Sequence, residues 1–348
     1  MTKYLSFKLL LVLILVNSNN SIAQINIESG VFTLKCGERF VSVDYRISSN
    51  NKQASANKFA LLLNGSPGDE FFAEVGDNYE LLQETLIWSG YKVIELRYTL
   101  TPGQSMYEDA EGFYSACLHQ GMNNVTKHSA DLYDLVINKL GFDPDNPDHR
   151  LVGLGFSLGA VQLQSMAFTH GRKFNDIVLT GVLVGDVVKG CLMGLKYLER
   201  MAFWAHSEED ICSEAIFSEG YSWASFIDLA QQLTTTGQGC CSEEDSYFFT
   251  CPDGAKSEYT DDLNFENQPF FNTSNLTIFE GNIACRTELP NEFIAANPAQ
   301  AKHIAEKRLA VGAPTKTYFF EKCSHEIVNC GGNEVLEMML KALAPEVI

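Results

Sequence analysis

Apolar runs and stretches of helical spacing alternate through much of the chain. Short apolar runs with polar or glycine flanks, typical of buried strands, lie at residues 59–63, 91–96, 151–156, 177–184, 276–279 and 317–320. Apolar residues recur at helical spacing over residues 79–89, 130–140, 158–168, 299–309 and 334–343. Gly90 and Gly141 follow two of these helices as stop signals. The alternation predicts an α/β fold with a mostly parallel sheet covered by helices.

Two regions depart from this alternation. Residues 32–34 and 41–45 precede it and predict an antiparallel edge of the sheet. Residues 189–275 interrupt it with a helix-like stretch and five of the ten cysteines, without strand periodicity. We therefore predict a core formed by residues 24–188 and 276–348, with residues 189–275 as a mainly helical, disulfide-tied cap.

The first residues predict an export signal. Lys3 and Lys8 precede the apolar run 9–16, and small residues at 21–23 suit cleavage after position 23. The run is shorter than the roughly 20 residues that span a bilayer, so we expect a secreted protein without stable membrane insertion.

The charge of the chain restricts its partners. The formal net charge is −19, and cleavage of residues 1–23 removes two lysines and no acid, which makes it −21. So acidic a surface argues against nucleic acid and anionic lipid as partners. A small-molecule ester or a peptide remains as the expected substrate, and no oligomeric state follows from the sequence.

The ten cysteines favour disulfides over a metal site. An even count behind an export signal is typical of an oxidising compartment. The alternative is zinc, but the chain has no C-x-x-C pair and no Cys/His spacing that fits a ligand cluster. Acceptors for N-glycosylation in a eukaryotic host lie at Asn124, Asn272 and Asn275.

A G-x-S-x-G sequence at 155–159 predicts the nucleophile. It follows the apolar strand 151–156 and opens the helix 158–168. A nucleophile on a strand-to-helix turn needs small neighbours two residues away, because the turn brings backbones close. We predict Ser157 as that nucleophile; the alternative is a buried serine in an ordinary turn.

The glycine-rich loop 64–68 follows an earlier strand and predicts an oxyanion hole. Pro67 has no N–H, so Ser66 is the better donor, partnered by the N–H of Leu158. The alternative is a simple turn, which the same composition would form.

His325 is the predicted general base. It comes after the strand 317–320, on a loop suited to receive a proton at the sheet edge, and it follows Ser157 in sequence. Cys323 and Cys330 flank it, and a bridge between them would hold the imidazole in place.

This series of strand-end motifs resembles the α/β-hydrolase superfamily over residues 31–188 and 276–348. Cys36-Gly37, the segment 41–45 and the Gly-Ser-Pro-Gly loop are similar to the secreted tripeptidyl- and prolyl-aminopeptidase-like branch. The nucleophile turn looks more like that of lipases, with Phe156 in place of their usual histidine.

The resemblance leaves the triad acid open. The branch places it after the seventh strand in a Gly-x-x-Asp pattern, where this chain has Ala284. Asp186 is preferred, because some lipases carry their acid after the sixth strand; Glu288 is the second choice. A capping aspartate is the other interpretation of Asp186.

The resemblance implies a secreted serine hydrolase that cleaves an ester or amide bond through an acyl-enzyme, without a cofactor or metal. Esterase or lipase activity and exopeptidase activity are both open. The alternative is a catalytically silent binding protein on the same fold, which the alanine at position 284 keeps open.

Overall fold

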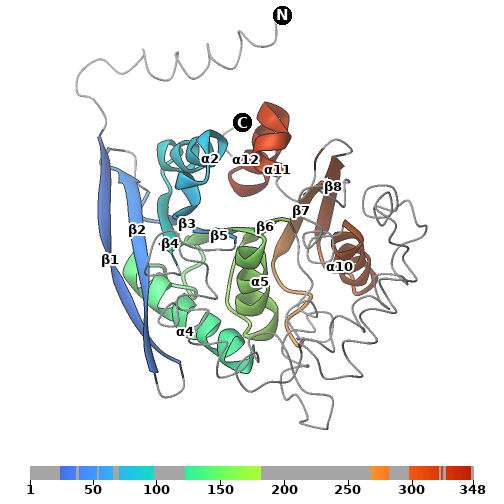
Figure 1. Cartoon of the computed structure of the whole chain (residues 1–348), viewed down its shortest axis with the longest axis horizontal. Helices are drawn as coiled ribbons and strands as arrows, with labels where there is room; N and C mark the ends of the chain where they lie inside the picture. Colours follow the sequence, from blue (N-terminus) through green and yellow to red (C-terminus); the bar gives the residue numbers. More distant parts are fainter. Residues whose placement is uncertain are drawn as a thin grey trace, which may run out of the picture.

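The fold is built on one eight-stranded sheet. The computed structural model describes residues 24–36, 39–52, 55–65, 70–97, 122–181, 268–281, 298–320, 323 and 327–345. The strand order is β1-β2-β4-β3-β5-β6-β7-β8, and helices cover both faces (Figure 1).

A long hairpin forms one edge of the sheet. β1 (Ile25–Cys36) and β2 (Arg39–Asn50) pair antiparallel over their whole lengths, and β2 is also antiparallel to β4 (Lys92–Arg97). Phe32 and Val43 alternate with more exposed neighbours, as expected of strands with one face on the core. The predicted antiparallel edge is confirmed, and its strands are longer than expected.

The remaining pairings are all parallel, so these strands end at a common carboxyl edge. The strands that join β4 there are β3 (Lys58–Leu63), β5 (Arg150–Phe156), β6 (Asp176–Thr180), β7 (Asn275–Gly281) and β8 (Thr315–Phe320). In β3 all five residues from Phe59 to Leu63 are buried, because apolar side chains pack on both faces of a central parallel strand.

Each face of the sheet has its own apolar cluster. One cluster involves the helices α4 (Met122–Leu140), α5 (Leu158–Gln164) and α10 (Pro298–Ala310). The other involves η1 (Phe72–Glu74), α2 (Asp77–Trp88), α11 (Ile327–Cys330) and α12 (Gly332–Leu343). Figure 1 shows the two helix layers on opposite sides of the sheet. Gly90 and Gly141 have positive φ beyond α2 and α4, as their stop role predicts.

Two predicted elements differ in part from the expectation. The described part of β6 ends at Thr180, and Gly181 follows with φ 56°, in the left-handed region that a strand does not use; residues 182–184 of the predicted run lie outside the described residues. The predicted helix 158–168 is α-helical only to Gln164 and continues as a π-turn, Ser165–Thr169.

The end of the predicted cap packs on the core. Phe271 is buried against Phe168, and the N–H of Phe270 donates to the carbonyl of Phe168. The export signal 1–23 and residues 182–267, which hold most of the cap, lie outside the described residues. Among the described helices, none has the length and apolar character needed to cross a bilayer.

Candidate active site

Ser157 stands on a strained turn between β5 and α5. Its backbone has φ 52° and ψ −115°, a conformation that costs a non-glycine residue about 1–3 kcal/mol. Its N–H donates to the carbonyl of Thr180 at 3.0 Å, and its carbonyl accepts the N–H groups of Ala160 and Val161. The surrounding backbone therefore holds Ser157 in this conformation, at the carboxyl edge of the sheet.

Glycine is required two residues before and after Ser157. A Cβ on Gly155 would lie 2.6 Å from the carbonyl oxygen of Gly159, which is too close for any side chain. A Cβ on Gly159 would collide with the carbonyl oxygen of Leu63, at the end of β3. The glycines of the G-x-S-x-G sequence thus permit the close approach of β5, α5 and β3, as predicted.

The loop after β3 passes directly against Ser157. A Cβ on Gly65 would lie 2.8 Å from the Cβ of Ser157 and 3.0 Å from the Cδ1 of Phe156. Asn64, which is 6% exposed, accepts the Gly65 N–H through Oδ1 and donates from Nδ2 to the Glu70 carbonyl. Asn64 thus bonds Gly65 and Glu70, the described residues on either side of the segment 66–69. Ser66, the predicted oxyanion donor, is the residue after Gly65.

Aromatic contacts connect Ser157 to the opposite helix layer. Phe156 meets Tyr79 of α2 edge to face at 6.1 Å, and Tyr79 meets Phe72 at 4.9 Å. Ile327 and Cys323 are buried in the same apolar cluster as these two rings. The segments on either side of position 325 therefore pack in the layer that supports the nucleophile turn.

A disulfide and a helix contact hold the segment around position 325. Cys323 and Cys330 are bridged with a Cα–Cα distance of 5.6 Å, which is the pairing proposed from the sequence. The Asn78 amide of α2 donates to the carbonyl of Val328 in α11 at 3.2 Å. The bond from Asn78 thereby holds α11 beside the start of α2, and the bridge ties Cys323 to the end of α11.

A buried ion network supports the residues that follow the glycine-rich loop. Glu95 of β4 accepts hydrogen bonds from Arg46 Nε at 2.8 Å, from the Ala73 N–H at 2.7 Å and from the Gln83 amide. Burial raises the pKa of Glu95, although the hydrogen bonds and the charge of Arg46 act to lower it. Ala73 lies in η1, so the network fixes the chain after the loop 64–70 onto the sheet.

The predicted site residues fall partly within the described chain. Ser157 is placed at the carboxyl edge, 9% exposed, and the backbone of Leu158 forms the first residue of α5. His325, Asp186, Glu288 and Ser66 lie outside the described residues. The structure therefore supplies the nucleophile turn and the flanks of the other predicted residues.

One buried carboxylate at this edge was missed in the sequence. Glu280 is 1% exposed and is the penultimate residue of β7. Its signal in the sequence is a charged residue directly after the apolar run 276–279. Among the described residues, no group of three His, Cys, Asp or Glu side chains is arranged to hold a metal ion.

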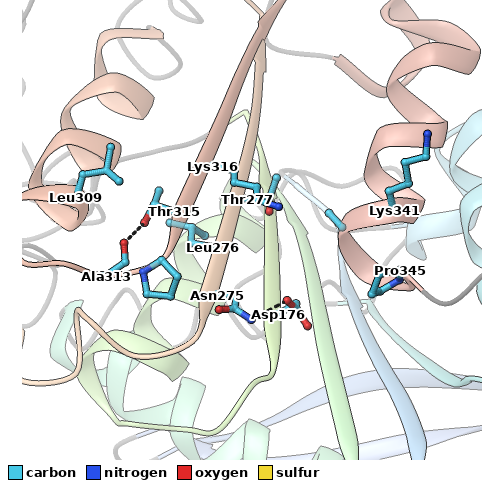
Figure 2. Close-up of a pocket in the computed structure, with 12 residues that line it drawn as sticks. Asp176, Asn275, Leu276, Thr277, Leu309, Ala313, Thr315, Lys316, Lys341 and Pro345 are labelled. Carbon is cyan, nitrogen blue, oxygen red and sulfur yellow. Dashed lines mark hydrogen bonds between the residues drawn. The ribbon is translucent and has the colours of Figure 1, made fainter. Parts of the chain in front are cut away.

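A cavity of about 540 Å³ lies at the opposite, amino edge of the sheet. There the Asp176 carboxylate accepts a bond from the Asn275 amide at 3.1 Å (Figure 2). Arg150 also donates to this carboxylate, at 2.7 Å. Lys316 of β8 and Lys341 of α12 are the other charged side chains that line the cavity. The acidic group is already paired, and the cavity lies away from Ser157.

Comparisons with known proteins agree on the fold. No protein-family model and no curated protein sequence matches the chain. Among solved structures, a lipase in an open form is similar with a TM-score of 0.53 at 15% identity, covering 92% of this chain and 99% of its own. A thermostable carboxyl esterase from Bacillus coagulans has a TM-score of 0.52 at 12% identity, covering 94% and 100%.

A third similar structure is a much larger protein. A putative dipeptidyl aminopeptidase IV from Bacteroides ovatus has a TM-score of 0.52 at 9% identity, covering 92% of this chain and 36% of its own. Sequence identities this low show a shared fold but not a shared activity. The strand order and these likenesses together show that the chain has the α/β-hydrolase fold.

Proposed function

We propose that the protein is a secreted serine hydrolase that cleaves carboxylic esters through an acyl-enzyme on Ser157. The observation that carries the proposal is the backbone of Ser157, strained at φ 52° and pressed against Gly65. Strain of this kind persists where the surroundings enforce it, and such sites are commonly functional. The turn presents a hydroxyl at the edge where the glycine-rich loop supplies backbone donors.

In the proposed reaction His325 takes the proton from the Ser157 hydroxyl as the oxygen attacks the ester carbonyl. The N–H groups of Leu158 and Ser66 bind the resulting oxyanion, and the start of α5 adds its positive end. The carbon–oxygen bond to the leaving alcohol then breaks, and His325 gives that alcohol the proton. Water repeats the sequence and releases the acid.

The described residues that flank His325 support it as the base. Cys323 and Ile327, two residues before and two after it, are buried in the apolar cluster that contains Tyr79. Tyr79 in turn meets Phe156, the residue before Ser157. The bridge from Cys323 to Cys330 also supports export, because disulfides persist in oxidising compartments.

The esterase and the lipase of the same fold support an ester as substrate, and a peptide is the competing choice. A fluorophosphonate probe should label wild-type protein on Ser157, located by peptide mass spectrometry. A panel of p-nitrophenyl esters and aminoacyl or peptidyl p-nitroanilides should then give turnover on the esters. Turnover on nitroanilides alone would replace the esterase with an exopeptidase, and absence of labelling would favour a binding protein.

A further inference from the structure

β1 is an edge strand, and its outer side pairs with no strand among the described residues. It stands first in the strand order, and Figure 1 shows it as the outermost described strand at the left of the sheet. Its pairing with β2 runs without interruption from Ile25 to Cys36, so no bulge distorts it over that length. Such an edge presents a row of backbone N–H and C=O groups on which another strand can pair.

A bond just before the strand shows which of its backbone groups point outward. The N–H of Asn51 donates to the carbonyl of Gln24, and these two residues continue the register of β1 and β2. In an antiparallel ladder the bonded positions alternate, so every second residue after Gln24 bonds to β2. The backbone groups of the residues in between point to the outer side. Up to position 33 these residues are Ile25, Ile27, Ser29, Val31 and Thr33.

The side chains of the same residues form an uncharged face with two exposed apolar groups. Ile27 is 64% exposed and Val31 is 56% exposed, and Ser29 lies midway between them. Edge strands of natural proteins commonly carry a charge or a proline on such a face, which prevents pairing with another chain. From Ile25 to Thr33 this face contains neither. The sequence of β1 is therefore compatible with a further strand at this edge.

The charged side chains nearest to this face are already paired. Arg46 of β2 lies across from Ser29, and Asp44 lies across from Val31. Both belong to ion pairs, and so does Glu28 on the opposite face of β1. The pairs are Arg46 with Glu74 and Glu95, Asp44 with Arg97, and Glu28 with Lys139. This favours a contact made by backbone bonds and apolar side chains over a partner recognised by its charge.

A second copy of the same strand matches this edge. Two antiparallel copies of β1, related by a two-fold axis at Ser29, place each Ile27 across from the Val31 of the other copy. The residues with outward backbone groups then face one another, as an antiparallel ladder requires. The ladder extends over about 30 Å and contains about ten backbone bonds. That number of bonds is typical of a specific protein interface.

From this match we propose that the protein forms a symmetric dimer by pairing of its β1 edges, with the two-fold axis at Ser29. The two eight-stranded sheets then form one continuous sheet. Because each chain has one β1 edge, the contact closes at two copies. β1 stands four positions from β5 in the strand order, so the dimer is independent of the function proposed for Ser157.

The test measures the mass of the purified full-length protein by light scattering and sedimentation velocity. We expect the wild type to have twice the mass of one chain. Ile27→Lys combined with Val31→Lys places lysines across from each other at two points of the ladder, and should raise the dissociation constant about 10- to 100-fold. Ile27→Lys combined with Val31→Glu places each lysine across from a glutamate, and should return the dissociation constant close to the wild-type value.

The net charge of the chain makes the first double variant informative. Two added lysines reduce the formal charge of −19 and so weaken the general repulsion between copies. Dissociation of this variant therefore reports repulsion within the ladder. Phe40→Lys is the control, because Phe40 is 72% exposed on the same hairpin but lies across from Lys35, beyond the paired segment. It should leave the dimer intact.

Hydrogen exchange locates the contact. The N–H groups of Ile27, Ser29 and Val31 should exchange slowly in the dimer and faster on dilution. A monomeric wild type would overturn the proposal: slow exchange of these groups would then show that another segment of the chain covers the edge, and fast exchange that the edge is open. Equal dissociation of the two double variants, loss of the dimer in Phe40→Lys, or assemblies larger than two copies would also overturn it.

Discussion

The two edges of the sheet differ in the backbone and in the bonding of their polar groups. At the amino edge, Arg150 and the Asn275 amide both bond the Asp176 carboxylate. At the carboxyl edge, Ser157 is held in a strained backbone conformation, and the Oγ1 of Thr180 is buried without a hydrogen-bond partner. Satisfied polar groups stabilise a fold, whereas strain and unmet hydrogen bonds persist where the rest of the fold enforces them. Under the function proposed above, we expect the amino edge to contribute mainly stability and the carboxyl edge mainly chemistry.

The amino edge also contains the most heavily bonded buried cation. Arg308 of α10 is fully buried and donates to the carbonyls of Phe271, Thr273 and Ser274 and to the hydroxyl of Thr315. Its guanidinium lies 4.8 Å from the ring centre of Phe168. Burial lowers the pKa of Arg308 to about 10, so it remains charged at neutral pH. It joins α10 to the turn that enters β7.

The largest effect should come from the carboxyl edge. Ser157→Ala should lower kcat by about 10⁶-fold, since the nucleophile is lost, with little change in unfolding free energy. Steady-state hydrolysis of a p-nitrophenyl ester measures it. Ser165→Ala is the matched control, because Ser165 is also buried and its hydroxyl has no partner. Equal losses in the two variants would contradict the assignment of chemistry to Ser157.

At the amino edge the expected loss is in stability. Arg308→Met should reduce the unfolding free energy by about 3–5 kcal/mol, because it leaves several buried carbonyls without donors. Urea denaturation measures the loss, while kcat of the folded fraction should stay at the wild-type value. Lys307→Met is the control: it changes an exposed neighbour and should change the unfolding free energy little. A specific loss of kcat in Arg308→Met would break the separation between the edges.

A smaller effect should follow from crowding at the nucleophile. Gly65→Ala places a methyl group 2.8 Å from the Ser157 Cβ, and overpacking of this kind costs about 1–3 kcal/mol. If this free energy is lost from the arrangement of Ser157 that reacts, we expect kcat/KM to fall roughly 5- to 150-fold. Gly76→Ala is the control, because its new Cβ meets only the end of the Asn329 side chain. If kcat/KM is unchanged in Gly65→Ala, the loop moves freely over Ser157.

The fold was largely predictable because apolar runs and glycine stops act locally. The run 59–63 is the buried strand β3, and Gly90 and Gly141 have positive φ after α2 and α4. The left-handed backbone of Gly181 was not predictable from its run, because Val182 and Val184 continue the β-branched pattern past it in the sequence.

The tight turn at Ser157 was predictable for the same reason, since Gly155 and Gly159 mark backbone contacts that any side chain would block. The neighbours of Ser157 on β6 were not, because they follow from strand register. Only the pairing of β5 with β6 brings Thr180 beside Ser157, and one sequence contains no record of that pairing. Contacts between distant strands must be seen in the folded chain.

The bridge between Cys323 and Cys330 makes the fold of this segment depend on the oxidation state of these two cysteines. A ring this short removes about 2–3 kcal/mol of loop entropy from the unfolded chain, and it does so next to a helix of only four residues. So short a helix has almost no stability of its own. As free thiols, Cys323 and Cys330 would leave α11 dependent on the packing of Ile327 and Val328. The covalent bridge thus replaces the burial that a longer helix would provide.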